Sequence, residues 1–167
     1  IGGGDRCVIR VPSGIGGAEV VLSGLSRAAA ARKLVMEHIS PLSNAAGCGR
    51  VGIVEVLLGM AGMAVNRATS HDGCTPLYKA SERGYSEVVR LLLAHPATNV
   101  NQARTDDGRT PLYAACAKGH EDVVRLLLGH AATDVNQARK DTGSTPLWYA
   151  CQNGHEAVVR LLLAHPA

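Results

Sequence analysis

Thr110-Pro111-Leu112-Tyr113 is the central copy of a motif that occurs three times in this chain of 167 residues. Thr75-Pro76-Leu77-Tyr78 lies 35 residues before it, and Thr145-Pro146-Leu147-Trp148 lies 35 residues after it. Several neighbouring residues recur at the same spacing, namely Gly73, Ala80, Gly84, Val88, Arg90, Leu91, Leu92 and His95. A fixed period of this length is typical of stacked structural repeats.

Each copy of the motif predicts the start of a short helix. Thr75 is suited to cap the helix N-terminus, and Pro76 sacrifices no hydrogen bond at the first helical position. Gly84 is suited to end the helix, because glycine adopts the left-handed conformation without a Cβ penalty. A second helix is predicted from apolar residues spaced along one helix face, at Val88, Leu91 and Leu92. The polar loop ending in Asp107-Gly108 then predicts a turn or hairpin before the next motif.

With these motifs the chain resembles the ankyrin-repeat family, whose consensus carries Asp-Gly-x-Thr-Pro-Leu-His, then Gly-His, a leucine-rich helix and a Val-Asn pair. The matching residues include Asp107-Gly108-Arg109-Thr110-Pro111-Leu112, Gly119-His120, Gly154-His155, Val100-Asn101 and Val135-Asn136. The chain differs in having Tyr78, Tyr113 and Trp148 at the histidine position, and its period exceeds the usual 33 or so. The resemblance implies an all-α solenoid of stacked helix-turn-helix units joined by β-hairpin-like fingers.

The period also predicts how the chain is divided. Three repeats cover residues 70–104, 105–139 and 140–167, and the last is truncated before its finger. A degenerate repeat at 35–69 carries Ser40-Pro41-Leu42 in register. Residues 1–34 are expected to be a degenerate or poorly ordered segment, at best an eroded helix pair. We expect the chain to be a piece of a longer protein, because it begins with Ile1 and ends after a second helix.

The sequence argues against several classes of function. The net charge is only +3, and acidic residues alternate with basic ones in the loops, so we expect no nucleic-acid binding. The longest apolar stretch, Val51–Val65, contains Glu55 and is shorter than the roughly 20 residues a membrane helix needs. Gly14–Ala18 resembles a dinucleotide loop after a short strand, but no room remains for a βαβ unit.

Cysteines and histidines are expected to be structural. Cys116 and Cys151 occupy equivalent helical positions and are interpreted as small packing residues. No Cys-x-x-Cys spacing indicates a metal site, so we expect no metal and no cofactor. The recurring histidines predict contacts at helix ends rather than catalysis. We therefore expect no enzymatic activity, a reducing, cytoplasmic location with the nucleus as an alternative, and a monomer.

The predicted function is protein–protein interaction by a non-enzymatic scaffold. The resemblance implies contact positions in the fingers, just before Thr-Pro-Leu, and late in the first helices. Those positions are His71, Asp72, Cys74, Lys79, Glu82, Arg83, Asp106, Asp107, Arg109, Ala117, Lys118, Asp141, Ser144, Tyr149, Gln152 and Asn153. Tyr78, Tyr113 and Trp148 are expected to pack within the repeats, whereas Tyr149 is expected to be more exposed. The alternative is that the chain is the interaction segment of a larger enzyme, a kinase or ubiquitin ligase, whose catalytic domain lies outside it.

The resemblance also implies a modification. Members of the family are modified by an asparaginyl hydroxylase at the asparagine of the hairpin. Asn101 and Asn136 occupy that position, and Asn136 after Asp134-Val135 fits the preferred context better. The alternative is an unmodified asparagine that stabilises the turn with side-chain hydrogen bonds.

Overall fold

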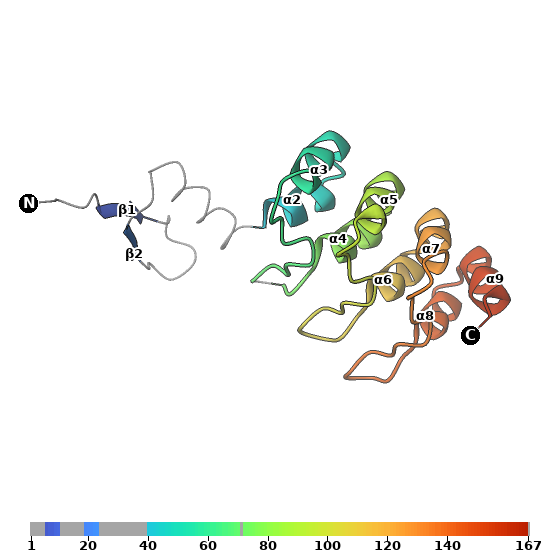
Figure 1. Cartoon of the computed structure of the whole chain (residues 1–167). Coiled ribbons are helices and arrows are strands. Elements are labelled where there is room, and N and C mark those ends of the chain that lie inside the picture. The colour runs from blue at the N-terminus through green and yellow to red at the C-terminus, as the bar shows by residue number, and fades with distance from the viewer. Residues whose placement is uncertain (1–5, 11–18, 24–39, 71, 167) are drawn as a thin grey trace, which may run out of the picture. The chain divides into compact units, whose positions relative to one another are not determined.

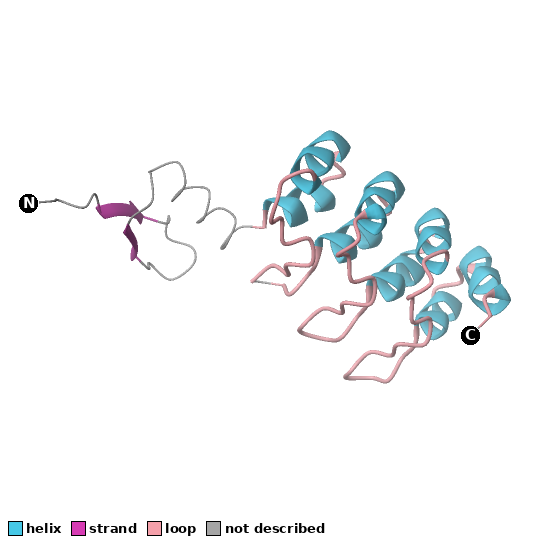
Figure 2. Ribbon diagram, viewed as in Figure 1, coloured by secondary structure: helices cyan, strands magenta, loops and turns pink. Residues whose placement is uncertain are grey.

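The computed structural model describes residues 6–10, 19–23, 40–70 and 72–166. The chain divides into two compact units, residues 1–41 and 42–167. In the first unit, β1 (Arg6–Arg10) and β2 (Glu19–Ser23) pair antiparallel, with Val8 opposite Val21 (Figure 2). The sequence analysis allowed at best an eroded helix pair within residues 1–34. Residues 6–10 and 19–23 form strands instead. Their β-branched residues favour extended backbone.

The second unit is a stack of helix pairs (Figure 1). Its described helices are α2 (Pro41–Gly47), α3 (Val51–Leu58), α4 (Pro76–Arg83), α5 (Ser86–Ala94), α6 (Pro111–Lys118), α7 (Glu121–Leu128), α8 (Pro146–Gln152) and α9 (Glu156–Ala164). Among the first helices, α4 packs on α6 and α6 packs on α8. The second helices form a parallel row through α3, α5, α7 and α9.

One continuous apolar core runs through the stack, from Leu42 in α2 to Leu162 in α9. Ala80, Ala115 and Ala150 are completely buried where successive first helices meet. Their small side chains allow the helix axes to approach closely. Valines and leucines of the second helices fill the remaining space. The predicted solenoid is therefore confirmed, and consecutive repeats share one core.

The predicted helix caps are present. The Thr75 and Thr110 side chains each accept a hydrogen bond of 3.1 Å from the backbone N–H three residues later, in Tyr78 and Tyr113. Thr145 accepts an equivalent bond of 3.3 Å from Trp148. The motif therefore satisfies an N–H group that the helix itself leaves unpaired.

Histidines at the start of the second helices join each repeat to the one before it. His120 Nε2 lies 3.0 Å from the carbonyl oxygen of Glu82, and His155 Nε2 lies 3.2 Å from that of Ala117. The His155 ring also lies over Gly119, where an added Cβ would come within 2.6 Å of Nδ1. Gly119 is therefore required both by its left-handed conformation, with φ of 72°, and by the neighbouring ring.

Asparagine side chains connect neighbouring loops in the same way. Asn66 donates to the carbonyl oxygen of Ala97 at 2.5 Å and accepts from the N–H of Asn99 at 2.8 Å. One repeat later, Asn101 donates to Ala132 at 2.6 Å and accepts from Asp134 at 2.9 Å. Each amide pairs both its donor and its acceptor with backbone, so the spacing between consecutive loops is fixed.

We predict that Gly119→Ala destabilises the fold more than Gly154→Ala. Both positions have similar left-handed backbone, with φ of 72° and 71°, so both variants lose about 1 to 2 kcal/mol from strain. An added Cβ at Gly154 meets nothing within 4 Å, whereas at Gly119 it overlaps His155. This overlap should cost a further 1 to 3 kcal/mol or so.

Urea unfolding of the two variants measures the difference directly. Equal losses of unfolding free energy would show that His155 does not restrict the space over Gly119.

Candidate functional site

The candidate site comprises the loop tips, here called fingers, and the exposed side of the first helices. The finger tips are residues 69–74, 104–109 and 139–144. Each is closed by two backbone hydrogen bonds. In one, the first residue of the tip donates to the last: Thr69 N–H to Cys74 at 3.0 Å, Arg104 to Arg109 at 2.8 Å, and Arg139 to Ser144 at 2.9 Å. In the other, the glycine N–H donates back to the first residue: Gly73 to Thr69 at 3.0 Å, Gly108 to Arg104 at 3.1 Å, and Gly143 to Arg139 at 3.0 Å. The described residues of the fingers form turns without a strand ladder, and Figure 1 shows the fingers on the side of the first helices.

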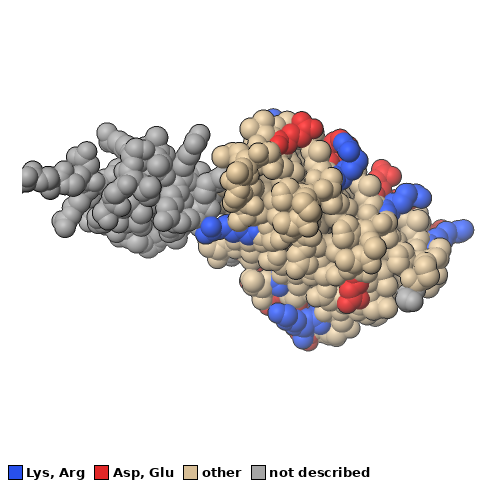
Figure 3. Space-filling view, viewed as in Figure 1, with Lys and Arg blue, Asp and Glu red and all other residues tan. Residues whose placement is uncertain are grey.

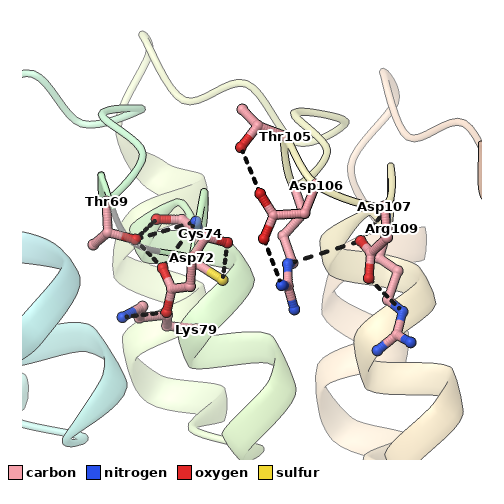
Figure 4. A network of polar contacts seen from close by, with 9 residues as sticks. Thr69, Asp72, Cys74, Lys79, Thr105, Asp106, Asp107 and Arg109 are labelled. Carbon is pink, nitrogen blue, oxygen red and sulfur yellow. Dashed lines mark hydrogen bonds and ion pairs between the residues drawn. The ribbon is translucent and has the colours of Figure 1, made fainter.

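Asp72 organises the first finger (Figure 4). Its carboxylate accepts hydrogen bonds from the Thr69 hydroxyl and, at 3.2 Å, from the N–H of Cys74. Its other oxygen lies 3.2 Å from Nζ of Lys79 in α4. Burial alone would raise the pKa of Asp72, but these hydrogen bonds and the Lys79 charge outweigh it and lower the pKa to about 2. Asp72 therefore stabilises the conformation of the first finger through contacts within the chain.

Cys74 was expected to contact a partner, but the structure buries its side chain. Its side chain is only 3% exposed and packs with Tyr78 and Ala114. Burial, and secondly the negative charge of Asp72, raise the pKa of the thiol to about 12. The thiol is therefore protonated at neutral pH and inaccessible to a partner. The residue points inward because the tight turn at Gly73 directs it under the finger.

The second finger holds a network of arginines and aspartates. Arg104 lies 2.9 Å from Asp106, and Nε of Arg109 lies 3.0 Å from Asp107. Arg104 lies over the Tyr78 ring at the start of α4, 5.8 Å from its centroid. Arg109 lies 5.7 Å from the centroid of the Tyr113 ring. Both cations are thus neutralised by carboxylates and stacked on aromatic rings.

The third finger repeats one ion pair of this network, because Arg139 and Asp141 are equivalent to Arg104 and Asp106. Arg139 pairs with Asp141 and donates a hydrogen bond of 3.4 Å to the hydroxyl of Tyr149. The Tyr149 ring also contacts Tyr113, with 5.0 Å between the ring centroids. The sequence analysis did not select Arg104 or Arg139. Their recurrence at the period of the repeat was the available signal.

The aromatic residues differ from expectation in one repeat. Tyr78 and Tyr113 are 1% exposed and pack as expected. Trp148 was expected to pack in the same way, but it is 51% exposed. Tyr149, expected to be the more exposed residue, is half-buried between Tyr113 and Trp148. The cause is the position in the stack, because Tyr78 and Tyr113 are covered by a following repeat.

Position in the stack also explains why the equivalent cysteines Cys116 and Cys151 differ in exposure. Cys116 is buried, as the packing interpretation requires, and burial raises the pKa of its thiol to about 12. Cys151 is exposed, so the packing interpretation is wrong for this residue. No described element stacks on the outer side of α8, which leaves the Cys151 position open to solvent. The four cysteines whose side chains the structure describes, including Cys48 and Cys74, are free thiols.

The remaining predicted contact residues fall into two groups. The exposed ones are Arg83, Asp106, Lys118, Asp141, Gln152 and Asn153. The half-buried ones are Asp72, Lys79, Glu82, Asp107, Arg109, Ala117, Ser144 and Tyr149. His71 lies outside the described residues. Arg83 and Lys118 occupy equivalent positions late in α4 and α6, and the ion pairs between described residues include neither of them.

The opposite row of helices carries charge pairs of its own. Arg125 pairs with Glu121 and Arg160 with Glu156, each four residues earlier in the same helix. Arg90 forms a third pair, because its Nε lies 3.0 Å from Glu87. Figure 3 shows red and blue side chains next to one another along the edge that the second helices occupy. These exposed pairs contribute little to stability.

The two candidate hydroxylation residues differ in their surroundings. Asn101 is half-buried and uses its amide in the two bonds to the next loop. Asn136 is exposed, and its backbone N–H donates to the Asp134 carboxylate at 3.0 Å. Asn136 is thus the more accessible of the two.

Neither a metal centre nor a membrane helix is found in the parts of the chain that the structure describes. No three His, Cys, Asp or Glu residues among them gather closely enough to hold a metal ion. None of the described helices is sufficiently long and apolar to cross a membrane.

The chain matches a family of known proteins. A family model described as ankyrin repeats (3 copies) matches residues 18–104 and 95–167, which together include most of the chain. No curated protein matches the chain.

We predict that Asp72→Asn lowers stability in a pH-dependent way. The folded-state pKa lies below the ordinary 3.8, so the ionised carboxylate stabilises the fold above about pH 4, and this contribution is lost as the pH falls through about 2. The variant should lose about 1 kcal/mol of unfolding free energy at neutral pH and converge on wild type in acid.

Asp106→Asn is the matched control. Asp106 and its ion-pair partner Arg104 both lie on the second finger, and the Asp106 side chain is half exposed. It should change stability by less than about 0.5 kcal/mol. If Asp72→Asn shows the same loss at pH 2 as at pH 7, the carboxylate charge does not stabilise the first finger.

Proposed function

The chain belongs to the ankyrin-repeat family, and we propose that it is a non-enzymatic scaffold that binds a partner protein through its finger tips and the exposed side of its first helices. Ankyrin repeats are in general protein-interaction modules, and the family match supports this part of the proposal. The choice of surface is supported by the fingers, whose backbone and side chains are fixed before any partner arrives. Such pre-ordering reduces the entropy lost on association.

The observation that carries the proposal is the paired bonding of Asn66 and Asn101. Each asparagine fixes the start of the next loop through two hydrogen bonds, so consecutive fingers keep a constant spacing. Ion pairs within the fingers, such as Arg109 with Asp107, hold the tips in one conformation. A partner therefore meets a row of similar but chemically different tips.

Arg83 and Lys118 are the best candidates for charge recognition on this surface. Lys79 and Arg109 are half-buried and neutralised by Asp72 and Asp107, so they support the fingers rather than offering free charge. Arg83 and Lys118 are exposed at the C-terminal ends of successive first helices. We therefore propose that the partner presents acidic groups to these two positions.

The test is affinity capture with the full chain, comparing wild type with Arg83→Glu/Lys118→Glu. We expect captured partners, identified by mass spectrometry, to bind the double variant about ten-fold more weakly, because like charges face each other across the interface.

The charge-matched control is Arg90→Glu/Arg125→Glu on the second helices, which changes the net charge equally on the opposite row. It should capture the same partners as wild type. If both double variants capture the partners as well as wild type does, the choice of surface is contradicted. If both lose binding, the attraction is an unspecific effect of net charge.

We also propose Asn136, in preference to Asn101, as the residue open to asparaginyl hydroxylation. Its exposure supports this choice, whereas the amide of Asn101 is engaged with Ala132 and Asp134. Mass spectrometry of the native protein should show an added oxygen on the peptide that contains Asn136. An oxygen on the Asn101 peptide alone, or on neither, would reject the proposal.

A further inference from the structure

Asn153 and Gly154 follow α8 and form the single Asn-Gly pair of the chain. This dipeptide is chemically reactive, because glycine has no Cβ to keep its backbone nitrogen away from the preceding side chain. That nitrogen can attack the amide carbon, Cγ, of the asparagine. The Asn153 side chain is exposed, so water reaches it.

The exposure of this position is a property of the repeat. Arg83 and Lys118 occupy the equivalent positions, and both are exposed although a further helix pair stacks on each of theirs. These two residues place positive charge at the C-terminal ends of α4 and α6, where the helix dipole favours it. At the end of α8 a neutral amide holds the position, and its conversion to a carboxylate would put a negative charge in a row of positive ones.

The fold holds the Asn153 amide against the preceding repeat. Nδ2 of Asn153 donates a hydrogen bond of 2.8 Å to the carbonyl oxygen of Ala117, near the end of α6. Nε2 of His155 lies 3.2 Å from the same oxygen. The nitrogen that leaves in a deamidation is therefore bonded across the contact between two repeats.

The attacking nitrogen, that of Gly154, is restrained as well. Its N–H donates to the carbonyl oxygen of Cys151 at 3.1 Å, and the next N–H, in His155, donates to Ala150 at 2.9 Å. The imide ring contains Cβ and Cγ of the asparagine and this nitrogen, so it closes only when Cβ and the nitrogen are nearly eclipsed about the Cα–C bond. Asn153 has ψ of 1°, which places them far from that arrangement. Attack therefore requires that the turn first opens.

We infer that Asn153 is a site of spontaneous deamidation, and that the reaction proceeds when the end of α8 detaches from α6. The Gly154 nitrogen loses its proton to solvent and bonds to Cγ of Asn153, and Nδ2 takes up a proton and leaves as ammonia. Water then opens the cyclic imide, which leaves aspartate or isoaspartate in place of asparagine. Overall one water is consumed and one ammonia is released.

The product weakens the contact that protected its precursor. An aspartate has no N–H to donate to Ala117, and its negative charge lies at the C-terminal end of α8, where the helix dipole disfavours it. The charge also joins the row of Arg83 and Lys118. The deamidation itself is independent of the proposed function, and only its effect on an acidic partner rests on that function.

Mass spectrometry of the peptide that contains Asn153 measures the reaction. The full chain and a capped peptide of residues 149–156 are incubated at neutral pH, and aspartate and isoaspartate are quantified over time. We expect the full chain to react at least about ten-fold more slowly than the peptide, because local opening of a packed helix end precedes the attack. In the full chain, Asn153→Gln keeps an amide at the position and should not react over the same time, since its longer side chain must close a larger ring.

Two glycine variants locate the opening, and both glycines have left-handed backbone, so the strain is matched. Gly119→Ala brings a Cβ within 2.6 Å of Nδ1 of His155, at the contact that holds Asn153, and should accelerate deamidation about ten-fold. Gly84→Ala brings a Cβ within 2.7 Å of Nδ1 of His120, one contact earlier in the stack, and should accelerate it much less. Circular dichroism of both variants confirms that the helices are retained.

Three results would overturn the inference. They are equal rates in the full chain and the peptide, equal acceleration by Gly84→Ala and Gly119→Ala, and no aspartate or isoaspartate in Gly119→Ala when the peptide has fully reacted. None of these measurements involves a partner protein, so failure here is distinguishable from failure of the proposed function.

Discussion

A helix pair of this length cannot bury its own apolar side chains, and this constraint determines the rest of the structure. Each first helix is short and begins at a Thr-Pro or Ser-Pro pair, so it offers few residues to cover the second helix behind it. The core therefore forms between consecutive pairs, with fully buried alanines at Ala80, Ala115 and Ala150. Stability becomes a property of the interfaces between neighbours.

The polar residues at those interfaces set the geometry of the fingers. His120 and His155 contact carbonyl oxygens at the end of the preceding first helix, and Asn101 contacts backbone in the following loop. Each of these hydrogen bonds joins a repeat only to its neighbour. The position of each finger is consequently set by contacts between adjacent repeats.

Finger residues divide into those that support the surface and those that are available to a partner. Lys79, Asp72 and Asp107 have polar partners within the chain, and Cys74 is buried beneath the first finger. Arg83 and Lys118 remain exposed, and so does Trp148. The proposed partner-binding surface is thus smaller and less charged than a list of polar finger residues suggests.

The sequence by itself determined the period, the helix caps and the positions that form the core, because these depend on local backbone preferences and on apolar spacing within one unit. It also determined that Thr75 and Thr110 cap helices, which the structure confirms. Sequence could not separate Tyr113 from Trp148, or Cys116 from Cys151, because each pair is equivalent within the repeat. Only the tertiary structure decided which member is buried, since burial depends on whether another repeat stacks on that side.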